Sequence, residues 1–114
     1  MMSVSQQGAH AMVRAKFAIG QLITHSLYGY RGVIIDADPE FSLSNDWYER
    51  MATTRPSKQQ PWYHVLVNNS SIQTYVCESS LEPDFTEQAI QHPMVDIVFS
   101  GRSHGHYVLA DKIN

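Results

Sequence analysis

The 114 residues include 43% hydrophobic and 17% charged side chains, which is sufficient for one compact core and excludes a disordered chain. Eight Lys and Arg against eleven Asp and Glu give a formal net charge of -3, which disfavours the strongly basic class of nucleic-acid-binding domains. The single cysteine cannot form a disulfide within the chain and no run approaches the ~18 consecutive apolar residues of a membrane span, so we expect a cytoplasmic protein.

The beginning of the chain is rich in Ser, Gln, Gly and Ala and has no apolar periodicity before Lys16. This composition is typical of frayed chain ends. We therefore predict a flexible arm over residues 1–15, followed by one domain with a C-terminal extension over residues 16–114.

Short strands dominate the first half of the predicted domain. A bend rich in tyrosine and glycine, residues 28–32, separates an alternating segment from a β-branched strand over residues 33–38. Because charges on an edge strand block pairing with other sheets, we expect the acidic residues of segment 36–40 on a solvated edge. Strict alternation divides the side chains of this strand between two faces, with Val33, Ile35 and Ala37 on one and Ile34, Asp36 and Asp38 on the other.

A short helical insert is predicted next. Residues 44–46 supply N-cap candidates, and Trp47 and Met51 fall on one helical face. The helix is expected to end before Pro56, because the residue that precedes a proline is biased away from helical conformation.

The clearest strand is residues 61–67, in which apolar residues alternate. The polar turn 68–71 joins it to a second β-rich run, residues 72–77, and we expect this hairpin at the centre of the sheet. The predicted buried face carries Val33, Ile35, Tyr63, Val65 and Val67, opposite Trp62, His64 and Leu66.

The last third of the chain has weaker signals. Residues 82–83 are expected to break the chain, and residues 92–93 to start a short helix that reaches Phe99. A glycine-bearing loop over residues 100–105 then precedes an edge strand at residues 107–109. Several short strands, one helical insert and no β-α-β spacing predict a mainly β fold, a small and strongly bent β-barrel.

Three motifs suggest chemistry that the rest of the chain does not support. The segment VIIDADPE weakly resembles the nucleophile strand of haloacid dehalogenase phosphatases, but the parallel-sheet pattern of those enzymes is missing. The pair His104 and His106 could bind a metal with His92 or His64, although the usual ligand spacings are missing. Cys77 lies in a β-rich run without a basic neighbour, as is typical of a core residue. We expect no enzyme activity, no metal and no cofactor.

Aromatic and basic residues gather at two predicted bends, both at strand ends. Loop aromatics of a small barrel either close its mouth or stack on bases or a peptide, and both roles stay open here. The candidate binding residues are His25, Tyr28, Tyr30 and Arg31 at the first bend, and Arg55, Lys58, Trp62, Tyr63 and His64 at the second.

Four segments in order carry a family resemblance: KFAIGQLITHSLYGYRGVIIDADPEFSLS, QPWYHVLV, TYVCESSLEPD and HPMVDIVF. Together they resemble the YccV-like family of hemimethylated-DNA-binding proteins, which includes the HspQ relatives, over about residues 16–99. The resemblance implies an SH3-like β-barrel without catalysis. It also implies two roles, binding of hemimethylated DNA and, in the stress response, adaptor action for an ATP-dependent protease of the Lon type. The insert 45–58 and the tail 92–114 differ from the shorter HspQ form.

The two implied roles would use the chain differently. In DNA binding, Arg31, Arg55 and Lys58 would contact phosphates while the bend aromatics pack on sugars or bases. In the adaptor role, the same aromatic loops or an exposed strand edge would engage the protease or its clients by β-augmentation. DNA binding is the first expectation because the family name carries it, and the acidic balance favours the adaptor role almost equally. A small homo-oligomer is compatible with both.

Overall fold

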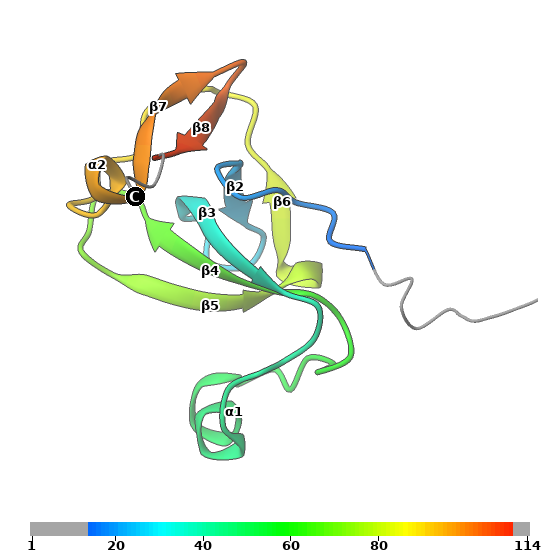
Figure 1. Ribbon diagram of the computed structural model, residues 1–114. Helices are drawn as coiled ribbons and strands as arrows, with labels where there is room; N and C mark the ends of the chain where they lie inside the picture. The colour runs from blue at the N-terminus through cyan, green and yellow to red at the C-terminus, as the bar shows by residue number, and fades with distance from the viewer. Residues whose placement is uncertain (1–13, 111–114) are drawn as a thin grey trace, which may run out of the picture.

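The computed structural model describes residues 14–110, so most of the predicted arm, residues 1–13, lies outside the described part. Within it, a five-stranded antiparallel sheet has the strand order β5-β4-β3-β2-β6 (Figure 1). A separate two-stranded hairpin is formed by β7 and β8. The strands of the main sheet are β2 (Leu22–His25), β3 (Arg31–Asp38), β4 (Trp62–Val67), β5 (Gln73–Cys77) and β6 (Leu81–Pro83). The hairpin consists of β7 (Phe99–Ser103) and β8 (His106–Leu109).

Three short helices connect these strands. Helix α1 (Asn45–Met51) begins at the N-cap Ser44, whose side chain accepts a hydrogen bond from the Trp47 N–H. The 3-10 helix η3 (Glu78–Ser80) follows β5, and α2 (Val95–Val98) precedes β7. None of the helices in the described residues is long and apolar enough to cross a membrane. The predicted helical insert is confirmed as α1.

The mainly β fold class is confirmed, whereas a closed barrel is not found among the described residues. The two edges of the main sheet, β5 and β6, are not paired with each other. They still approach the same core, because Val76 of β5 and Leu81 of β6 pack in one hydrophobic cluster. The sheet is therefore curved around its core but open between β5 and β6.

A β-bulge in β3 changes the faces predicted for this strand. The register with β4 shifts between Ile34 and Asp36, so Ile35 is the additional residue. Ile34 then pairs with Val65 and packs on the core face, whereas Asp36 and Asp38 lie on the same face as Val33. The strict alternation predicted from the sequence is wrong here, because it does not allow for an inserted residue.

Both faces of the sheet are covered, which the sequence did not predict. One face buries the cluster of Phe17, Ile23, Ile34, Tyr63, Val65, Val76 and Leu81. At one end of the other face, α2 and the β7–β8 hairpin cover Leu22, Val33 and Leu66. At the opposite end, Tyr48 of α1 and Ala52 pack against Trp62, Tyr75 and Cys77. Figure 1 shows α1 at the end of the molecule opposite the β7–β8 hairpin. Trp62 and Leu66, which the alternation placed opposite the predicted buried face, are consequently buried as well.

Five other sequence expectations differ from the structure. Strand β3, expected at an edge, is the central strand, and β5, expected at the centre, is an edge. The predicted chain break at residues 82–83 lies in β6, and the predicted loop at 100–105 contains most of β7. The last predicted strand is confirmed as β8, but it pairs with β7 and not with the main sheet. These differences all concern which strands pair, which depends on contacts between distant segments.

Candidate functional site

A hollow of about 510 Å³ runs beside β5 and is called the β5 groove below. All five residues of β5 line it, from Gln73 to Cys77. One wall is the β2–β3 turn with Leu27, Tyr28 and Tyr30, and the other is the end of α1 with Met51 and the segment after it. Its volume lies in the range typical of ligand sites.

The β2–β3 turn is held in place by His25. The imidazole Nδ1 accepts hydrogen bonds from the backbone N–H groups of Leu27 and Tyr28, at 3.1 and 3.0 Å. The ring also stacks on Tyr28 with centroids 4.7 Å apart. Burial lowers the pKa of His25, in agreement with a neutral ring whose Nδ1 is an acceptor. His25 thus holds Tyr28 in its position at the groove. His25 was predicted as a binding residue, and the structure shows it stabilising the turn that carries Tyr28.

Aromatic rings form the part of the groove under α1. Trp62 and Tyr75 stack with centroids 5.3 Å apart, and Trp47 meets Tyr75 edge to face at 5.5 Å. The Tyr75 hydroxyl donates to Asp38 Oδ2 at 2.8 Å, which joins β5 to the end of β3. Burial raises the pKa of Tyr75, although the hydrogen bond with Ser42 partly offsets it. The packing of these rings fixes Tyr75 on the edge strand.

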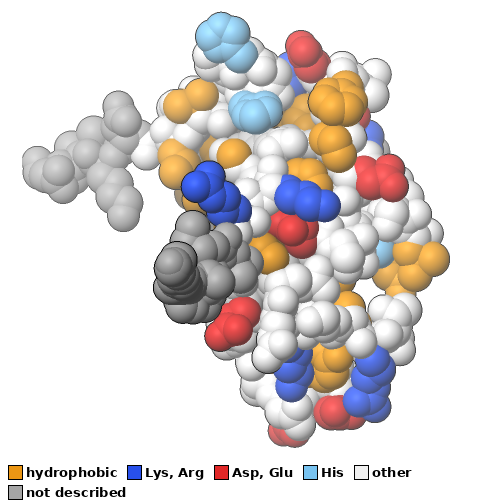
Figure 2. Space-filling model, turned by 90° about the vertical axis from the view of Figure 1, so that its right-hand side faces the viewer, with side chains coloured by type: hydrophobic (Ala, Val, Ile, Leu, Met, Phe, Trp, Pro, Cys, Tyr) orange, Lys and Arg blue, Asp and Glu red, His pale blue; other side chains and the backbone are white. Residues whose placement is uncertain are grey.

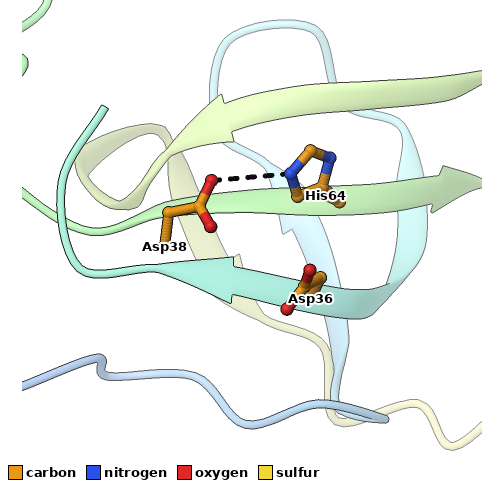
Figure 3. A group of neighbouring side chains, drawn as sticks. All are labelled: Asp36, Asp38 and His64. Atoms are coloured by element: carbon orange, nitrogen blue, oxygen red, sulfur yellow. Dashed lines mark ion pairs between the residues drawn. The ribbon is translucent and has the colours of Figure 1, made fainter. Parts of the chain in front are cut away.

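Asp36, Asp38 and His64 form a small polar cluster on the same face (Figure 3). Asp38 Oδ2 lies 3.5 Å from His64 Nε2, and their side chains point toward one another. Burial alone would raise the pKa of Asp38, but hydrogen bonds from Ser42 and Tyr75 outweigh it and hold the pKa below its ordinary value. Carboxylate and imidazole atoms of the three residues lie within 4.8 Å of one another, close enough to share a cation. Asp38 already accepts these two hydrogen bonds from the protein itself.

The cations expected to contact phosphates are engaged in internal contacts. Arg31 Nε donates to Asp84 Oδ2 at 2.6 Å, and its Nη2 donates to the Gln88 carbonyl. Arg55 is paired with Glu49 at 2.8 Å. Lys58 Nζ lies 4.4 Å from the centre of the Tyr48 ring. Figure 2 shows Lys and Arg side chains interspersed with Asp and Glu on the face that it views, without a continuous basic patch.

A comparison with known families identifies the chain. The family model described as hemimethylated DNA-binding protein YccV like matches residues 15–106. This chain belongs to the YccV-like family. The match spans the main sheet, α1 and most of the β7–β8 hairpin of the YccV-like chain, and it includes every residue that lines the β5 groove.

The YccV-like structure separates the predicted binding residues into two groups. Those that line the β5 groove are His25, Tyr28, Tyr30, Trp62 and His64. Those that do not line it are Arg31, Arg55, Lys58 and Tyr63. The last of these is fully buried, and its hydroxyl donates to Glu78 Oε2 at 2.7 Å. The two sequence bends therefore meet at one site through their aromatic and histidine side chains only.

Sequence reasoning missed the apolar rim of the groove of this YccV-like protein. Leu27, Met51 and Ile72 are 64, 60 and 55% exposed at its rim, although each is apolar. The strand edge of β5 itself was also missed. A signal was present in the sequence, because segment 70–77 contains no charged residue, which is unusual for an edge strand.

Proposed function

We propose that this YccV-like chain is a noncatalytic adaptor that binds a segment of another protein in the β5 groove, as a specificity factor for an ATP-dependent protease of the Lon type. The observation that carries the proposal is the lining of the groove, which includes no Asp, Glu, Lys or Arg among the described residues. A nucleic-acid backbone requires cations, whereas an apolar hollow with aromatic walls suits protein side chains.

The rim of the β5 groove supports this function. Leu27, Tyr28, Met51 and Ile72 each expose more than half of their surface. Exposed apolar side chains around a concave site mark interaction surfaces, and tyrosine is enriched among residues that dominate binding energy. Their burial by a partner would supply the driving force, since the groove offers little electrostatic attraction.

The proposal predicts that the protein accelerates degradation of a defined client by a purified Lon-type protease. For the double variant Tyr28→Ser, Met51→Ser, the concentration that gives half-maximal acceleration of degradation should rise at least about tenfold. Both wall residues are replaced by small polar ones, so the variant should bind its partner more weakly. Titrating wild type and variant into the degradation assay measures this difference. Ile97→Ser is the matched control, since Ile97 is 67% exposed on α2 and does not line the groove.

Two results would contradict an adaptor function that is carried by the β5 groove. The first is an unchanged degradation rate for clients that the protease accepts, at saturating amounts of the YccV-like chain. The second is equal activity of wild type and the Tyr28→Ser, Met51→Ser variant, which would remove the groove from the function even if acceleration occurs.

Hemimethylated DNA binding is the second candidate, and the family description favours it. With Arg31 held by Asp84, the cations of the predicted set that could turn toward phosphates are Arg55, whose side chain is 61% exposed, and Lys58. The slope of log K against log salt should then be no steeper than about -2. The additional methyl group changes only one apolar contact in the major groove, so discrimination should be about 1 kcal/mol.

Fluorescence anisotropy on matched hemimethylated and fully methylated duplexes tests this candidate. If DNA is the ligand, Arg55→Gln should reduce the salt slope by about one unit. Tyr28→Ser, which removes no charge, should leave the slope unchanged. Absence of binding at low salt, where electrostatic attraction is least screened, would exclude DNA as the ligand of this chain.

A further inference from the structure

We infer that the β5 groove takes an extended, uncharged segment of the partner and adds it to the sheet as a strand beside β5. This inference rests on the protein-binding function proposed above and specifies the chemistry of the bound segment. It is carried by the hydrogen-bonding pattern of β5, by the contrast between the two edges of the sheet, and by the side chains that line the groove.

The hydrogen-bonding pattern leaves one side of β5 open. Val67 N–H donates to the Ile72 carbonyl at 3.0 Å, and Glu78 N–H donates to the Pro61 carbonyl at 2.9 Å. In an antiparallel ladder the bonded residues alternate, so Thr74 and Val76 complete the bonds to β4. The N–H groups that point away from β4 are those of Gln73, Tyr75 and Cys77. All three residues line the groove; Gln73 is exposed at its rim, whereas Tyr75 and Cys77 are buried, 8 and 3% exposed. The carbonyls of Gln73 and Tyr75 point the same way, which is the pattern that a further strand requires.

The two edge strands of the sheet differ in the residues that prevent pairing with a further strand. Strand β6, at the other edge, contains Glu82 and Pro83, a charge and a residue without an N–H group. Both are ordinary means of preventing strand addition. Strand β5 contains neither charge nor proline, and its edge faces the hollow. The chain thus blocks one edge and leaves the other able to pair.

The walls of the groove define the side chains that such a segment can carry. Thr74 lies on the side of Tyr30, whose hydroxyl is 3.1 Å from Thr74 Oγ1, and Tyr75 lies on the side of Trp47. Side chains of an added strand would therefore alternate between the wall with Tyr28 and the wall with Met51. A charged side chain there would lose water without gaining a partner, so the segment is uncharged. Apolar or small polar residues fit both walls.

The length of the segment follows from β5. Five residues at about 3.4 Å each span roughly 17 Å, so four or five residues of the partner can pair along this edge. A second copy of the chain that paired through its own β5 would bring two sets of exposed rim side chains together. An unfolded or extended segment of a partner has no such rim and enters the groove more readily. We therefore assign such a segment as the strand that pairs with β5.

The experiment uses the full chain and a capped nine-residue peptide in which leucine and valine alternate with threonine and serine. Amide hydrogen exchange should show new protection at Gln73, Tyr75 and Cys77 when the peptide is bound, and little change at Thr74 and Val76, which already bond to β4. The same peptide with N-methyl groups on its strand-pairing amides should bind about tenfold more weakly, because two or more hydrogen bonds are lost. A version with lysine and glutamate in place of leucine should not bind.

Variants of the chain complete the test. Gln73→Pro removes an outward N–H without touching the ladder to β4, and it should weaken the peptide about tenfold. Gln73→Ala is the matched control, which loses the same side chain but keeps the N–H, so the difference in peptide affinity between the two variants reports the backbone hydrogen bond. If Gln73→Pro does not fold, the N-methylated peptide tests the same hydrogen bonds from the ligand side.

Three outcomes would overturn the inference. The first is peptide binding without protection of the three outward amides, and the second is equal binding of the N-methylated peptide. The third is protection that rises with protein concentration in the absence of peptide, which would assign the edge to a second copy. In the first two cases the degradation assay with Tyr28→Ser, Met51→Ser still measures the adaptor function independently, so failure of strand addition and failure of the adaptor role are distinguishable.

Discussion

Replacing Val65 by aspartate should unfold the protein. Val65 has no exposed surface and lies in the interior strand β4, paired with Ile34 of β3 and Thr74 of β5. An aspartate there would place a carboxylate among Ile23, Ile34 and Val76 without a partner. Because an unpaired buried charge is among the most costly changes in a core, we expect a loss of more than about 4 kcal/mol in the free energy of unfolding.

Thermal and denaturant unfolding followed by circular dichroism measure this loss. The matched control is Ile97→Asp, since Ile97 is a β-branched residue that is 67% exposed. It should change the free energy of unfolding by no more than about 0.5 kcal/mol. A Val65→Asp protein that melts within a degree or two of wild type would contradict the assignment of this face of β4 to the core.

Replacing Arg31 by alanine should also destabilise the protein strongly, in contrast to a role in phosphate binding. Its partner Asp84 has a side chain that is only 5% exposed, and Arg31 itself is 20% exposed. Breaking a largely buried ion pair leaves the other charge without its partner, so we expect a loss of about 3 kcal/mol in the free energy of unfolding. Arg55→Ala is the control, because the exposed pair with Glu49 should contribute less than about 1 kcal/mol.

The loss of stability caused by Arg31→Ala should become smaller as the pH is lowered. Burial alone would raise the pKa of Asp84, but hydrogen bonds from Thr86 and Arg31 outweigh it and lower the pKa from its ordinary value of 3.8. A carboxyl whose pKa is lower in the folded state stabilises the protein above pH 3.8, and this stabilisation is lost as the pH falls through the lower, folded value. Removing Arg31 reduces the shift. The difference between wild type and variant should therefore narrow between pH 7 and pH 3.

Denaturant unfolding of wild type and Arg31→Ala at several pH values tests this sign. A gap that widens on acidification would mean that Asp84 is not the partner that matters. If Arg31→Ala is as stable as wild type at pH 7, the ion pair with Asp84 does not stabilise the fold. Arg31 would then again be a candidate for phosphate binding.

The composition and local patterns of the sequence were sufficient for the fold class and for several elements. The alternation of residues 61–67 predicted β4, because a strand with β-branched and aromatic side chains is specified by its own residues. Ser44 and the following residues predicted α1 for the same local reason, since an N-cap acts on the helix that it begins. The first bend rich in aromatic residues also pointed to His25, Tyr28 and Tyr30, which line the β5 groove.

Only the tertiary structure decided which of these features face solvent and which strands remain unpaired. The bulge at Ile35 reverses the face of Asp36 and Asp38, and a single inserted residue leaves no mark in the hydrophobic pattern. Arg31 appeared available for phosphate until Asp84, 53 positions away, was found beside it. Strand order likewise depends on pairing between distant segments, so the open edge of β5, where the groove lies, could not be read from the residues of β5 alone.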